Sequence, residues 1–123
     1  MIDAMTNRKI LYVEDDALLR MVTVLALKDA GFDVFEAANG IQAQAELAMG
    51  QFDCVISDIS MPGGVSGIEV ARTAQAMNPA CVTVLVSGYA LSQLPPLPPT
   101  ARFLSKPYRM HELLGTLDAR GNA

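Results

Sequence analysis

Short apolar runs alternate with helical patterns along the whole chain, and this alternation limits the fold more than any other feature. Five runs indicate strands, and the central ones are apolar throughout, as in strands covered on both faces. They span residues 10–13, 33–37, 52–57, 81–86 and 101–105. Strands that alternate with helices form parallel sheets with helices packed on both sides. The sequence therefore predicts an α/β fold with a five-stranded parallel sheet.

Helical patterns fill most of the intervals between these runs. Asn39 can cap the second helix, and Ser66 with Glu69 has the spacing of a capping box that opens the third. Residues 110–117 carry a closing helix. Gly31 ends the first helix. The apolar positions of that helix recur at i, i+3, i+4 and i+7: Leu18, Met21, Val22 and Leu25.

The interval between residues 87 and 106 breaks the rhythm. A helix is due there, but four of the seven prolines stand within residues 95–99. Proline lacks an N–H and clashes with the preceding helical turn, so a regular helix cannot run through this segment. We expect at most a single turn, around residues 91–94.

The composition excludes several classes of protein. With 123 residues, 51% hydrophobic and 18% charged, the chain is one folded domain rather than a disordered one. The net charge of −4 argues against nucleic acid as a partner. No apolar run approaches the roughly 20 residues that cross a bilayer. Cys54 and Cys81 each lie in an apolar run, which favours reduced core thiols in the cytoplasm over a disulfide or a metal site.

Polar residues follow four of the predicted strands and would meet at one edge of the sheet. They are Glu14 and Asp15, then Asp58, Ser87 and Lys106. Carboxylates held close together repel unless a cation intervenes, and a hard divalent ion such as Mg²⁺ relieves the repulsion. The lysine supplies a positive charge suited to phosphate. Such a site is suited to receiving a phosphoryl group, because metal and ammonium neutralise the charge of the transfer.

Four motifs in this order identify a family: ILYVED at 10–15, DISMPG at 58–63, SGY at 87–89 and FLSKPY at 103–108. With them the chain resembles a response-regulator receiver domain, the phospho-acceptor module of two-component signalling. The resemblance covers residues 8–118 and leaves 1–7 and 119–123 as terminal tails. It implies a flavodoxin-like, doubly wound sheet with strand order 2-1-3-4-5, whose fourth helix is here shortened or lost.

The resemblance also implies the chemistry of the site. Asp58 would take a phosphoryl group from the phosphohistidine of a histidine kinase or phosphotransfer protein. Mg²⁺ would be bound by Asp15, Asp58 and the backbone carbonyl of Ser60, with Glu14 acting through water. Asp16, one position further on, caps the first helix. The chain would then be a self-phosphorylating and self-dephosphorylating switch rather than a classical enzyme.

Residues on the last two strands would respond to the phosphoryl group. The resemblance implies that Ser87 donates its hydroxyl to one phosphoryl oxygen and that Lys106 pairs with another. Phe103 would turn inward when Ser87 moves, although it can also be an ordinary core aromatic and Tyr89 the mobile one. The Lys106–Pro107 bond is expected to be cis.

The chain departs from the family in the spacing between Ser87 and Lys106, which is about three residues shorter than usual. The missing residues fall within the proline segment. The acceptor residues lie elsewhere, so only the output face is affected. We expect no dimer through that face, and hence a monomer or a weak dimer. The motifs are closest in style to receivers of hybrid histidine kinases or to stand-alone receivers.

Three other functions compete with this interpretation. A hydrolase of the haloacid dehalogenase type needs a second aspartate at the position of Ser60. An FMN carrier on the same fold needs a phosphate loop where the chain has Glu14 and Asp15, which would repel phosphate. The strongest alternative is a pseudo-receiver that binds partners without being phosphorylated, although no essential residue of the site is missing.

Overall fold

The computed structural model describes residues 8–118 and confirms the predicted fold class. All five strands are parallel, in the order β2-β1-β3-β4-β5 of a flavodoxin-like sheet. Their bounds are β1 Lys9–Val13, β2 Asp33–Ala37, β3 Cys54–Asp58, β4 Val82–Ser87 and β5 Arg102–Ser105. Both predicted terminal tails, 1–7 and 119–123, lie outside the described residues.

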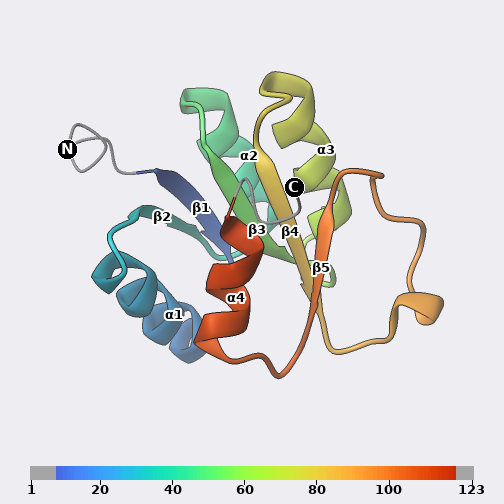
Figure 1. Cartoon of the computed structure of the whole chain (residues 1–123). Helices are drawn as coiled ribbons and strands as arrows, with labels where there is room; N and C mark the ends of the chain where they lie inside the picture. Colours follow the sequence, from blue (N-terminus) through green and yellow to red (C-terminus); the bar gives the residue numbers. More distant parts are fainter. Residues whose placement is uncertain (1–7, 119–123) are drawn as a thin grey trace.

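Helices cover both faces of this sheet, with α1 and α4 on one face and α2 and α3 on the other (Figure 1). The helices are α1 Ala17–Asp29, α2 Gly40–Met49, α3 Gly67–Met77 and α4 Met110–Leu117. Val24 and Leu113 bury their side chains against one face, and Leu47 and Val70 against the other. The two apolar layers explain why the central strands contain almost no charged residue.

Some predicted strand bounds are wrong by one or two residues. Phe52 and Cys81 are buried, at 5% and 4% exposure, but both precede the first paired residue of their strands. At the other end, Ser87 belongs to β4 because it pairs with Ser105. Likewise, β1 begins at Lys9 and β5 at Arg102. Apolar character marks burial, whereas the ladder is defined by backbone pairing, and the two need not begin together.

The predicted caps of three helices are confirmed. Asp16 accepts a hydrogen bond from the backbone N–H of Leu19 at the start of α1, at 3.0 Å. Asn39 caps α2 in the same way. Ser66 and Glu69 form the complete capping box of α3, each side chain accepting from the other's backbone N–H. These caps satisfy N–H groups that the helix itself leaves unpaired.

The first helix turns its apolar stripe away from the sheet. The four residues whose spacing predicts the helix are between 53% and 67% exposed: Leu18, Met21, Val22 and Leu25. The buried side of α1 consists instead of Thr23, Val24 and Leu27. Helical spacing of apolar residues therefore predicts the element but not which side faces the core.

The connection from β4 to β5 has lost its α-helix, as the prolines predict. A single 3₁₀ turn, Leu91–Gln93, is the only helical piece between those strands. The loop then runs along the outer edge of the sheet (Figure 1). Leu94 and Leu97 pack against a small core cluster that includes Ile68 and Leu85. Two leucines on an irregular segment thus cover apolar surface that a helix would otherwise cover.

Both cysteines are buried free thiols, as the sequence favours. Burial raises the pKa of Cys54 to about 11 and that of Cys81 to about 12, so both stay protonated at neutral pH. Within residues 8–118, no helix has the length and apolar character needed to span a bilayer.

A glycine fixes the position of α3 against β3. The N–H of Gly67 donates to Ile59 O at 2.9 Å, and a Cβ at residue 67 would lie 2.0 Å from Asp58 O. That atom belongs to the backbone and cannot move without displacing the end of β3. Any side chain at this position therefore pushes α3 away from the strand that carries Asp58.

We predict that Gly67→Ala lowers the free energy of unfolding by about 1–3 kcal/mol, the usual cost of overpacking. The matched control is Gly115→Ala on α4, where a Cβ meets nothing within 4 Å. Alanine is the better helix former, so this control should stabilise the protein by about 0.5–1 kcal/mol. Urea unfolding measures both. Equal stability of the two variants would contradict the close approach.

Candidate functional site

The ends of β1, β3 and β5 bring three charged side chains together. Glu14 follows β1, Asp58 ends β3 and Lys106 follows β5. The Lys106 ammonium lies 3.1 Å from Glu14 Oε1 and 2.8 Å from Asp58 Oδ1. The side chains of Glu14 and Asp58 are only 4% and 8% exposed, whereas that of Lys106 is 28% exposed. One ammonium therefore serves two buried carboxylates.

The site holds more negative charge than its lysine can neutralise. Burial, the largest cause, and the neighbouring Glu14 together raise the pKa of Asp58 from its ordinary 3.8 to about 7, although Lys106 opposes both. Burial lowers the pKa of Lys106, but its hydrogen bonds to Asp58 and Glu14 outweigh this effect, and the net change is a rise. The ammonium thus stays charged, and Asp58 still lacks a full counter-charge.

A divalent cation would supply the missing charge. Glu14, Asp15 and Asp58 each offer a carboxylate oxygen, and these oxygens lie within 4.8 Å of one another. Hard oxygen donors with excess negative charge are the ligands that Mg²⁺ prefers. The acidic cluster of Glu14, Asp15 and Asp58 is therefore compatible with a Mg²⁺ site.

Most predicted site residues border one hollow of about 310 Å³ at this edge of the sheet. Besides the charged residues, Ser60, Ser87 and Tyr89 line it. Ser87 is 5% exposed, and its Oγ accepts a hydrogen bond from the N–H of Tyr89 at 2.9 Å. Tyr89 itself is 58% exposed. The hollow is thus walled by the acidic cluster, the lysine and a serine hydroxyl.

The remaining predicted residues lie close to this hollow without all bordering it. Asp16 is at its rim, but its side chain caps α1. Phe103 lies on β5 and packs in the cluster with Leu85 and Leu94, outside the lining of the hollow. The peptide bond between Lys106 and Pro107 is cis.

Sequence reasoning missed Arg20, which supports the acidic loop from α1. Its Nη1 donates to the backbone oxygen of Glu14 at 2.7 Å, and its Nε pairs with Glu36 at 3.3 Å. A signal was available, since Arg20 is the only charged residue within residues 17–27. A lone arginine on an apolar helix indicates a specific acceptor nearby, although not which one.

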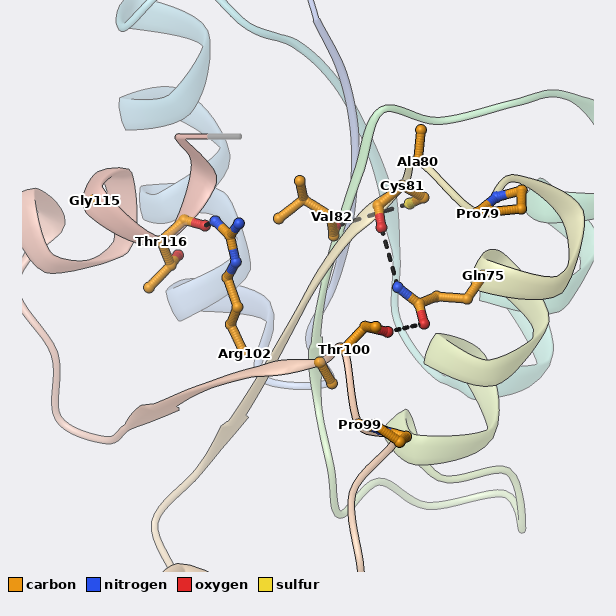
Figure 2. A pocket seen from close by; sticks show the side chains of 11 residues that line it. Gln75, Pro79, Ala80, Cys81, Val82, Pro99, Thr100, Arg102, Gly115 and Thr116 are labelled. Carbon is orange, nitrogen blue, oxygen red and sulfur yellow. Dashed lines mark hydrogen bonds between the residues drawn. The ribbon is translucent and has the colours of Figure 1, made fainter. Parts of the chain in front are cut away.

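A larger hollow of about 690 Å³ lies at the opposite edge of the sheet, where β4 and β5 begin (Figure 2). Its polar groups are already paired with each other. Gln75 donates to Cys81 O at 3.3 Å and hydrogen-bonds to Thr100, and Arg102 points to the carbonyl of Thr116. Among the described residues that line it there is no cluster of carboxylates like the one at the acidic edge.

Comparisons with known proteins agree with this geometry. The family model described as response regulator receiver domain matches residues 10–118. The chain is 34% identical over 114 residues to the response regulator receiver protein CpdR of Brucella abortus, covering 90% of this chain and 94% of that protein. It is 36% identical over 121 residues to the sensor kinase CckA of the same species, covering 94% of this chain but 13% of that kinase.

A solved structure shows the same architecture. The crystal structure of a response regulator receiver protein from Sinorhizobium medicae matches with a TM-score of 0.87 at 29% identity, covering 97% of this chain and 98% of that one. The strand order, the acidic cluster and the family match therefore all indicate the same kind of domain, and the family match covers nearly the whole chain. The chain belongs to the response regulator receiver domains of two-component signalling.

Proposed function

We propose that the chain accepts a phosphoryl group on Asp58 from the phosphohistidine of a histidine kinase or phosphotransfer protein. The observation that carries the proposal is the Asp58 carboxylate itself, buried beside Glu14 and bonded to Lys106. A carboxylate with a pKa near neutral pH and too little counter-charge is poised for a ligand that brings cations with it. A phosphoryl group held with Mg²⁺ is such a ligand.

The transfer needs little covalent chemistry from the protein. An Asp58 oxygen attacks phosphorus, the bond from phosphorus to the donor imidazole nitrogen breaks, and that nitrogen keeps the electron pair. Lys106 would neutralise one phosphoryl oxygen. Asp15, Asp58 and the carbonyl of Ser60 would hold Mg²⁺ directly and Glu14 through water, and this ion would neutralise the others. Positioning and charge therefore account for most of the catalysis.

Ser87 is suited to sense the new group. Its Oγ accepts from the Tyr89 N–H, which leaves the hydroxyl hydrogen free to donate to a phosphoryl oxygen. A movement of Ser87 would be passed to Tyr89 through this bond. Phe103 does not line the hollow and packs with Leu85 instead. It would therefore respond to the phosphoryl group only through a movement of β5. The proposed switch thus comprises Ser87 with Tyr89 or Phe103.

The exposed stripe of α1, formed by Leu18, Met21, Val22 and Leu25, offers a docking face for the donor. α1 begins three residues after the acidic Glu14, which borders the hollow, so the stripe begins close to the acceptor site. An apolar partner helix laid on it would bring a phosphohistidine towards Asp58. We propose the chain as a cytoplasmic phosphorelay switch, a monomer or weak dimer. A phosphorylation-independent interaction module remains the alternative.

We predict that acetyl phosphate with Mg²⁺ adds one phosphoryl group to the wild type and none to Asp58→Asn. Intact-mass spectrometry measures the product directly. Asp33→Asn, which alters an exposed aspartate at the start of β2, is the control and should be labelled like the wild type. An unlabelled wild type would favour the pseudo-receiver.

We predict that Asp58→Asn stabilises the metal-free protein at high pH. In the folded wild type Asp58 keeps its proton up to a pKa of about 7, whereas the unfolded chain releases it near 3.8. Folding therefore binds a proton in this window, and wild-type stability falls as pH rises from about 4 to 7. In EDTA at pH 8 the variant should be more stable by up to about 4 kcal/mol, the free energy that corresponds to this pKa shift.

The gain should vanish near pH 4, where Asp58 is protonated in both states, and Mg²⁺ at pH 8 should reduce it by stabilising the wild type. Urea unfolding across the pH range measures it, with Asp33→Asn as control. A variant less stable than the wild type at pH 8 would show that Lys106 fully compensates Asp58.

We predict that Val22→Glu slows phosphoryl transfer from a protein donor at least about tenfold while labelling by acetyl phosphate stays unchanged. The donor is a purified histidine kinase, autophosphorylated with radiolabelled ATP, that labels the wild type. Met49→Glu, at an 86% exposed position at the end of α2, is the control and should behave as wild type. Equal transfer to all three proteins would exclude the stripe as docking face.

A further inference from the structure

A tyrosine lies in the core next to the site, at a position where phenylalanine would fill the same space without a polar group. Tyr12, on β1, is 2% exposed and packs among apolar side chains such as Val24, Ile56 and Leu113. Removing a hydroxyl from water is costly unless it is hydrogen-bonded. The net gain from such a buried bond is small, so stability alone gives little reason for tyrosine here.

The Tyr12 hydroxyl joins two other elements. It lies 3.1 Å from the hydroxyl of Tyr108, in the segment between β5 and α4, and it also hydrogen-bonds to Thr23 of α1. Thr23 is 2% exposed, and Tyr108 packs against the same core cluster. Three hydroxyls therefore connect β1, α1 and the segment that follows β5.

This connection runs parallel to the ion pair of the site. Tyr12 stands two residues before Glu14, and Tyr108 stands two residues after Lys106. The same two segments are thus joined twice, by the hydroxyl pair in the core and by Lys106 Nζ to Glu14 Oε1 at 3.1 Å. The backbone N–H of Lys106 donates to Ser87 O at 2.9 Å, but Pro107 has no N–H to donate. Between Pro107 and Arg109, the N-cap of α4, the side chain of Tyr108 is the contact that joins the segment to β1.

We propose that Tyr12 and Tyr108 are positioning residues that hold Lys106 against Asp58 through the segment between β5 and α4. With the hydroxyl pair in place, the lysine stem starts from a fixed backbone and its ammonium stays with both carboxylates. Without it, the segment gains freedom and the ammonium is at the site for a smaller fraction of time. The inference rests on the proposed function only for its kinetic readout.

The test is a double-mutant cycle with acetyl phosphate and Mg²⁺, followed by intact-mass time courses. Tyr108→Phe and Tyr12→Phe should each slow phosphorylation about fivefold, the effect of about one hydrogen bond. In a Lys106→Ala background the same substitutions should change the rate by less than about twofold, because the group they position is gone. Equal slowing in both backgrounds, or none in either, would overturn the proposal.

Thr83→Val is the matched control, since Thr83 is 1% exposed on β4 and its hydroxyl has no hydrogen-bond partner within residues 8–118. It removes a buried hydroxyl unconnected to Lys106 and should leave the rate unchanged. Should Tyr108→Phe fail to fold, Tyr12→Phe alone tests the proposal. We expect this variant to fold, because the Tyr108 side chain is only half-buried and its hydroxyl can hydrogen-bond to water instead.

A second readout needs no phosphoryl donor. In ¹⁵N NMR the Lys106 ammonium protons should be protected from exchange in the wild type, because two carboxylates accept them. The signal should weaken in both tyrosine variants but not in Thr83→Val. If the wild type takes up no phosphoryl group, the proposed function fails, and this signal still decides about the tyrosines. Unchanged protection in both tyrosine variants would overturn the positioning role.

Discussion

The cluster of Glu14, Asp58 and Lys106 is the constraint on which the rest of the structure depends. Two carboxylates are buried within reach of one ammonium, at 3.1 and 2.8 Å. Such a cluster does not stabilise the fold, since burial penalises both charges and one cation cannot neutralise both. The three side chains stay close together because the parallel sheet brings the ends of β1, β3 and β5 to the same edge, whichever residues stand there. The apolar layers on both faces therefore provide the stability that the site lacks.

Incomplete neutralisation also leaves the site open to a cation. A fully compensated ion pair would have no use for a ligand, whereas Asp58, with a pKa near 7, is stabilised by any cation that reaches it. Mg²⁺ is positively charged and a phosphoryl group negatively charged, so at this site each would partly neutralise the other. Gly67 adds a geometric condition, since α3 approaches the carbonyl of Asp58 too closely for any side chain. Backbone packing thus holds Asp58 in place while its charge stays only partly neutralised.

The sequence predicted the elements and the site better than it predicted contacts. The strand order, the caps at Asp16, Asn39 and Ser66, and the lost helix follow from local chemistry or from the family motifs. The outward stripe of α1 does not, because helical spacing is the same for a core face and for a docking face. Arg20 and the Tyr12–Tyr108 pair were missed for a related reason. Their partners are distant in sequence or are backbone atoms, and no spacing rule encodes such contacts.

The proline segment between β4 and β5 shows how a receiver can lose a helix and keep its core. Leu94 and Leu97 cover Ile68 and Leu85 in its place. An irregular segment normally leaves backbone donors unpaired, but each proline removes one donor and also restricts the unfolded chain. The apolar side chains at this edge are therefore buried without a helix. Since no α-helix stands there, a partner that binds this edge of the sheet would contact the irregular segment itself. The same prolines that remove the helix thus also change the surface that this edge of the sheet presents.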